Sequence, residues 1–181
     1  AGGEVLQLSE ASDLAGGEDA YLRRVRGRTA ALCSAATGLG GVIAGQDEAT
    51  VKALFDYGDA LGVAFQMVDD LLDYAGTDAT GKNIGDDFRE RKLTLPVIKA
   101  VAQADDDERA FWVRTIQKGK QGEGDLDTAL GLLAKHDTLS ATKVEAVAWA
   151  DKAKAALDGL PEHPIRQMLL DLADYVVARV R

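Results

Sequence analysis

The chain has 181 residues, of which 46% are apolar and 28% are charged, a composition ordinary for one globular domain with a sizeable core. Its net charge of −9 argues against a basic, nucleic-acid-binding surface. One cysteine and two histidines are too few for a disulfide framework or a closed zinc site. The sequence has no window apolar enough for a membrane span and no signal-peptide pattern at its start, so we expect a cytoplasmic protein.

Alanine and leucine are plentiful and β-branched runs are short, which favours an all-α fold. We predict a single helical domain over residues 1–181. The predicted helices cover residues 19–37, 48–75, 93–104, 106–118, 125–135, 138–157 and 163–180. Between the second and third lies a long, glycine-rich polar segment from Gly76 to Arg91. In a compact helical domain such a loop is usually either functional or disordered.

The second predicted helix contains the segment FQMVDDLLDY, from Phe65 to Tyr74. At about 100° per residue, four polar side chains share one arc of this helix: Gln66, Asp69, Asp70 and Asp73. A solvated acidic face is the general alternative. However, like charges four residues apart destabilise a helix, and no basic residue lies between Lys52 and Lys82 to offset them. The pattern therefore predicts an external cation.

Carboxylates without Cys or His ligands suit a hard cation. Magnesium in particular is held by one or two carboxylates, waters and substrate phosphate oxygens. A calcium-binding EF-hand loop starting at Asp69 is excluded, because its sixth position is Tyr74 instead of glycine and no glutamate closes the loop. We therefore predict Mg²⁺ as the cofactor.

The polar loop and the residues after it supply positive charge. Lys82 lies in GKNIGDD and Lys92 in ERKLTLP, and lysine acts on phosphate as a mobile point charge. Together with the carboxylates and a metal, these lysines describe a diphosphate site. The segment GTDATGKN resembles a P-loop, but Asn83 stands where that motif needs Ser or Thr, and no strand precedes it.

At this point the residues resemble a known family. FQMVDDLLDY followed by GKNIGDDFRERKLTLP is similar to the second aspartate-rich motif and lysine loop of the trans-isoprenyl diphosphate synthases, the polyprenyl synthetase family. Gly3-Glu4 with Gln7-Leu8 and the triplet Arg28-Thr29-Ala30 resemble further motifs of the family, as does the last helix. The resemblance implies the C-terminal half of the isoprenoid synthase helical-bundle fold.

The resemblance also implies a transferase that condenses an allylic prenyl diphosphate with isopentenyl diphosphate to elongate an isoprenoid chain. Ionisation of the allylic diphosphate would depend on Mg²⁺. The implied metal ligands are Asp69, Asp70 and Asp73, which would act in catalysis with Lys82 and Lys92. The implied substrate-binding residues are Arg28, Thr29, Gln66, Lys82 and Lys92. Arg28 departs from the family, which commonly has lysine there, and Asp86 matches an acidic position with an indirect role at the metal.

The family's first aspartate-rich motif has no counterpart in the sequence. We therefore expect the chain alone to be inactive, with the N-terminal half cleaved, left out or supplied by a partner chain, and the intact protein to be a homodimer. Two other hypotheses are a noncatalytic regulatory subunit of a prenyl diphosphate synthase and an unrelated helical metal-binding module. The sequence does not define product length, but it leans towards bacterial octaprenyl and decaprenyl synthases.

Other polar residues have simpler interpretations. The acidic run from Asp105 to Glu108 opens a predicted helix, where negative charge favours the helix dipole, so we interpret it as a cap. His136 and His163 lie near predicted helix ends, and we assign neither a catalytic role.

Overall fold

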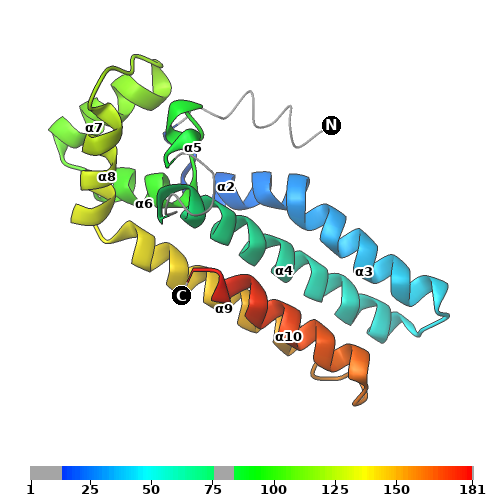
Figure 1. Ribbon diagram of the computed structural model, residues 1–181. Coiled ribbons are helices and arrows are strands. Elements are labelled where there is room, and N and C mark those ends of the chain that lie inside the picture. The colour runs from blue at the N-terminus through cyan, green and yellow to red at the C-terminus, as the bar shows by residue number, and fades with distance from the viewer. Residues whose placement is uncertain (1–13, 76–83, 181) are drawn as a thin grey trace. The chain divides into compact units, whose positions relative to one another are not determined.

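The computed structural model describes residues 14–75 and 84–180 (Figure 1). Every regular element in these ranges is helical, which confirms the all-α prediction. The elements are α2 (Gly17–Val25), η1 (Arg26–Ala30), α3 (Ala31–Ile43), α4 (Glu48–Ala75), α5 (Asp86–Arg89), α6 (Leu95–Gln103), α7 (Asp106–Trp112), η3 (Val113–Gln117), α8 (Asp125–Lys135), α9 (Thr138–Ala156) and α10 (Pro164–Ala178). Within the described ranges, none of these helices is both long and apolar enough to cross a lipid bilayer.

Two predicted segments differ from the structure. The first predicted helix was too short: after the π-helical turn η1, helix α3 continues to Ile43 through a glycine-rich run that sequence propensity counts as helix-breaking. The predicted polar loop contains the short helix α5. The residue before this helix, Gly85, has a left-handed backbone conformation with φ 79°. Residues 76–83 of that loop lie outside the described residues.

The chain divides into two compact units. The first contains α2 and α5 to α8, together with α4 from Asp69 and α9 up to Thr142. The second contains η1, α3 and α10, with α4 up to Val68 and α9 from Lys143. That residues 1–181 form one helical domain remains a prediction.

Glycines of α4 allow η1 and α3 to pack closely against this helix in the second unit. A Cβ at Gly62 would lie 2.5 Å from Cα of Ala30, and one at Gly58 would lie 2.5 Å from the carbonyl oxygen of Cys33. Any larger side chain at these positions would separate the helices. Figure 1 shows the resulting antiparallel pair, with α3 running beside α4. The hydroxyl of Tyr57 donates to the carbonyl of Leu169, at 2.8 Å, and thereby connects α4 to α10.

Aromatic side chains form the core of the first unit. Phe88 of α5 is 2% exposed and packs against Phe111 and Trp112 of α7, with ring centroids 6.5 and 6.4 Å away. These contacts hold α5 in place even though a helix of four residues has little stability of its own. The burial of Phe88 explains why the loop departs here from the irregular structure predicted for it.

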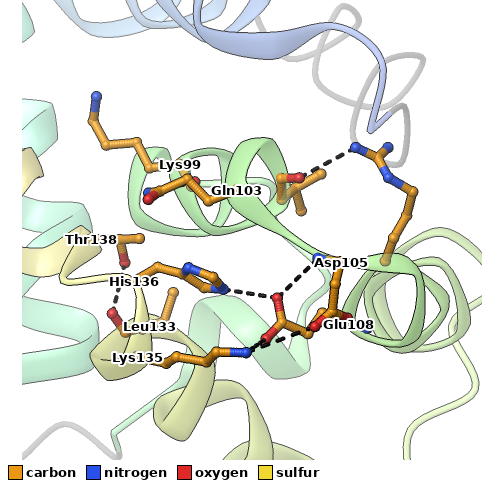
Figure 2. A network of polar contacts seen from close by, with 10 residues as sticks. Lys99, Gln103, Asp105, Glu108, Leu133, Lys135, His136 and Thr138 are labelled. Carbon is orange, nitrogen blue, oxygen red and sulfur yellow. Dashed lines mark hydrogen bonds and ion pairs between the residues drawn. The ribbon is translucent and has the colours of Figure 1, made fainter.

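A polar network joins α7 to the end of α8 (Figure 2). Asp105 and Glu108 form a reciprocal capping box at the start of α7, which confirms the predicted cap. The buried carboxylate of Glu108 also accepts hydrogen bonds from Lys135, at 2.5 Å, and contacts Nε2 of His136, at 2.8 Å. These bonds lower the pKa of Glu108 to about 2. The network is structural, and His136 acts here as a partner of the cap.

Candidate functional site

The three aspartates of the acidic motif lie in the last two turns of α4, in the first unit, and have different surroundings. Asp70 is only 4% exposed and accepts a 2.8 Å hydrogen bond from the hydroxyl of Tyr21 in α2. Asp69 and Asp73 are half-buried. The predicted arc therefore contains one carboxylate bonded inside the protein and two that are partly open to solvent.

Asp73 connects the end of α4 to the segment that contains α5. The N–H of Gly85 donates to its carbonyl oxygen at 2.9 Å, and the N–H of Asp87 donates to its carboxylate Oδ2 at 3.1 Å. Burial, followed by the negative charge of Asp87, raises the pKa of Asp73 to about 6. Negative charge at this place is incompletely neutralised by the protein, so a bound cation would be stabilised.

Lys92 lies next to the same pair. Its ammonium group donates to Oδ1 of Asp87 at 2.9 Å and to Oε2 of Glu90 at 2.7 Å, while 36% of its side chain remains exposed. Burial lowers the pKa of Lys92, but its hydrogen bonds to Glu90 and Asp87 outweigh that effect and raise it overall. Lys92 is therefore a fixed positive charge that still reaches solvent.

Asp87 is the residue of this site that the sequence analysis missed. Its backbone contacts Asp73 and its carboxylate contacts Lys92, whereas Asp86, which the motif comparison selected, pairs with Arg89 at 2.9 Å. The doubled aspartate in GDD was the available signal. It could not tell which of the two faces Lys92, because that depends on the start of α5. Lys82 lies outside the described residues.

The second unit contains the other predicted substrate-binding residues. Thr29 lies in the π-helical turn η1 and donates from Oγ1 to Oε1 of Gln66 on α4, at 2.9 Å. Gly62 allows this close approach, because Ala30 of η1 packs directly over it. Arg28 is exposed on the same turn. Single π-helical turns within longer helices occur frequently at functional sites.

The donor set of the first unit suits a magnesium ion bound with phosphate. In the described ranges, no three Asp, Glu, His or Cys side chains form a complete metal cage. Magnesium typically takes one or two carboxylates and completes its coordination with waters and phosphate oxygens. Two half-buried carboxylates, Asp69 and Asp73, with incompletely neutralised charge at the second, fit that requirement.

Comparison with known proteins places these features in a family context. The family model described as Polyprenyl synthetase matches residues 1–133. Octaprenyl diphosphate synthase of Haemophilus influenzae is 40% identical over 178 residues, which are 98% of this chain and 54% of the relative. The chain thus spans about half the length of the curated relatives it matches.

Solved structures agree in fold. A decaprenyl diphosphate synthase from Rhodobacter capsulatus is 65% identical, with a TM-score of 0.93 over 99% of this chain and 55% of that protein. A polyprenyl synthase from Caulobacter crescentus, solved with calcium and isoprenyl diphosphate, is 46% identical, with a TM-score of 0.90 over 97% of this chain and 54% of that protein. At these identities the shared fold covers nearly all of the chain.

Proposed function

Because this chain belongs to the polyprenyl synthetase family, we propose that it forms part of a prenyltransferase that condenses an allylic prenyl diphosphate with isopentenyl diphosphate. The observation that carries the proposal is the arrangement of Asp73, Asp87 and Lys92 in the first unit. It combines a carboxylate that favours a cation with a protonated lysine held at a fixed position. A metal–diphosphate group needs both kinds of charge.

The first unit would bind the allylic diphosphate together with Mg²⁺. Asp69 and Asp73 would hold the metal directly, and Asp70 would contribute through its charge and its bond to Tyr21. When bound, magnesium would act as a Lewis acid on the diphosphate oxygens. The relative from Caulobacter crescentus, solved with calcium and isoprenyl diphosphate, supports a divalent cation and a diphosphate as ligands.

Lys92 would stabilise the negative charge that grows on the diphosphate as the allylic carbon–oxygen bond breaks. Because Asp87 and Glu90 already fix its ammonium group, little reorganisation is needed during the reaction, which is the basis of electrostatic catalysis. Lys82 would add a second positive charge.

Thr29, Gln66 and Arg28 would contact substrate in the second unit. The hydroxyl group of Thr29 donates its hydrogen bond to Oε1 of Gln66, which fixes both side chains. The oxygen Oγ1 can still accept a hydrogen bond from a substrate. Arg28 is exposed, and its guanidinium would bind a phosphate through two N–H groups, where the family's usual lysine would present a point charge.

The activity would require the rest of the family's length, which the chain spans only in part. We still predict that the intact enzyme is a homodimer and that its product has octaprenyl or decaprenyl length. The similarity to octaprenyl and decaprenyl synthases supports the second of these.

The test is to express the complete protein that contains this chain and to incubate it with Mg²⁺, farnesyl diphosphate and radiolabelled isopentenyl diphosphate. We expect labelled prenyl products, their loss on chelation of the metal, and at least a hundredfold lower rate for Asp73→Ala. Asp171→Ala, an exposed aspartate on α10, is the matched control and should keep the activity. A complete protein that makes no product but stimulates another synthase would contradict the proposal and support the regulatory subunit.

A further inference from the structure

Tyr21 is the largest buried side chain of helix α2, and its hydroxyl bonds to the acidic motif of α4. Tyr21 is 3% exposed and donates at 2.8 Å to Oδ2 of Asp70, which is 4% exposed. Both residues belong to the first unit, although 49 positions separate them in the chain. Tyr21 belongs to none of the sequence motifs that predicted the site, so only the tertiary structure brings it there.

The partner of this hydroxyl is a charged side chain. A buried tyrosine hydroxyl needs a hydrogen-bond partner, and a backbone carbonyl is sufficient for that purpose. Tyr57 has this simpler arrangement, because it is fully buried and donates to the carbonyl of Leu169 at 2.8 Å. Tyr21 instead donates to a carboxylate. Since a phenol is neutral, its bond can orient that carboxylate without adding a positive charge beside it.

Orientation matters for Asp70 because of where this residue lies. Its carboxylate is buried, and a buried carboxylate is unfavourable unless hydrogen bonds compensate for the lost water. A hydrogen bond to an ionised acceptor is short and strong, so it restricts the rotation of the side chain. A carboxylate that is already oriented before a cation binds needs less reorganisation when the cation arrives.

Helix α2 is itself held in a defined rotation about its axis. Lys99 of α6 donates to Oε1 of Glu18 at 2.7 Å, and the guanidinium of Arg24 donates to the carbonyl of Leu93 at 2.7 Å. Glu18, Tyr21 and Arg24 are spaced three residues apart, so all three lie on one side of the helix. The two outer contacts therefore fix the direction in which the phenol between them points.

We propose that Tyr21 is a positioning residue of the metal–diphosphate site and acts by holding the carboxylate of Asp70 in the orientation that favours bound Mg²⁺. Tyr21 itself touches neither the metal nor the substrate. The inference rests on the proposed function, because it concerns the same site and assigns to α2 a part in binding the cation.

The experiment replaces Tyr21 by Phe in the complete protein that contains this chain. Tyr21→Phe keeps the buried ring and removes only the hydroxyl. Calorimetric titration with Mg²⁺ in the presence of inorganic pyrophosphate measures binding without turnover. We expect the affinity to fall about tenfold, because a hydrogen bond to a charged group is lost. In the transferase assay the Mg²⁺ requirement should rise by a similar factor, while the KM for isopentenyl diphosphate stays unchanged.

A double-mutant cycle separates positioning from a general effect on the fold. If Tyr21 acts through Asp70, the double variant Tyr21→Phe/Asp70→Ala should bind no more weakly than Asp70→Ala alone. Tyr57→Phe is the matched control, because it removes a buried tyrosine hydroxyl with an equally short bond, in the second unit. It should lower the unfolding temperature but leave the affinity for Mg²⁺ with pyrophosphate unchanged. All titrations are made below the unfolding transition of each variant.

Three results would overturn the positioning role: an unchanged affinity for Tyr21→Phe, losses that multiply in the double variant, or an equal loss for Tyr57→Phe. A complete protein that binds no Mg²⁺ with pyrophosphate would overturn the proposed function together with this inference. Intact binding of Mg²⁺ with pyrophosphate but no prenyl transfer would contradict the proposed function alone.

Discussion

The backbone N–H of Asp87 donates a 3.1 Å hydrogen bond to Oδ2 of Asp73, and the side chain of Asp87 accepts one of 2.9 Å from Lys92. A single residue thus connects a carboxylate of the acidic motif to the lysine proposed to bind diphosphate. Asp87 positions both charges, so its role can be tested separately from theirs.

Asp87→Ala should lower the kcat of the complete enzyme by about tenfold, because Lys92 would lose its more buried partner and a charge-assisted hydrogen bond is worth about 1.5–3 kcal/mol. The KM for the allylic diphosphate should rise as well. Glu90→Ala is the control: it removes the more exposed partner, 61% open to solvent, and should have a smaller effect. Steady-state kinetics would contradict this role if the two variants behaved alike.

Asp73→Asn should stabilise the metal-free chain while it weakens binding of Mg²⁺ with diphosphate. In the folded protein the pKa of Asp73 is raised to about 6 from a usual value of 3.8, so folding disfavours its charged form above that pH. Because solvent screens this half-exposed group, Asp73→Asn should raise the free energy of unfolding by only about 1 kcal/mol at pH 7. Thermal unfolding and calorimetric titration with Mg²⁺ and diphosphate measure the two effects. Asp56→Asn, at an exposed position earlier in α4, should change neither by much.

Gly62→Ala should destabilise the second unit by about 1–3 kcal/mol, because the added Cβ would overlap Ala30 and push η1 away from α4. The Thr29–Gln66 hydrogen bond should lengthen or break with it. Gly40→Ala on α3 is the control: its Cβ would meet nothing within 4 Å, and replacing a helical glycine by alanine stabilises by about 0.5–1 kcal/mol. Urea unfolding of both variants measures the free energy of unfolding, which should fall for Gly62→Ala and rise for Gly40→Ala.

The contact between α7 and α8 should weaken in acid through Glu108. Hydrogen bonds from Lys135 and His136 lower the pKa of this carboxyl to about 2, below its usual 4.5, so the folded chain binds its proton less readily than the unfolded chain. The stabilisation is therefore present above about pH 4.5 and is lost as the pH falls towards 2. Unfolding measured across this range should be less pH-dependent in Glu108→Gln. The exposed Asp107→Asn should keep the full dependence.

Much of this protein could be predicted from periodicity and motif chemistry. The helix from residue 48 to 75, the cap at Asp105 and the acidic arc of α4 depend on local backbone preference and on the 3.6-residue repeat, which sequence contains directly. The family resemblance followed from FQMVDDLLDY and the lysine loop, and the family match over residues 1–133 confirms it.

Other features depend on contacts between residues far apart in the chain. Helix α3 continues through its glycines because Gly38 and Gly41 lie against α4, although isolated glycines disfavour a helix. Asp70 and Asp73 look equivalent in sequence. In the structure, Asp70 accepts a hydrogen bond from Tyr21, whereas burial and the charge of Asp87 raise the pKa of Asp73. Sequence alone thus determined the helical class, the family and the kinds of residue at the site. Tertiary structure decided the partner of each carboxylate, because burial and hydrogen bonding depend on which distant side chains packing brings within about 3 Å.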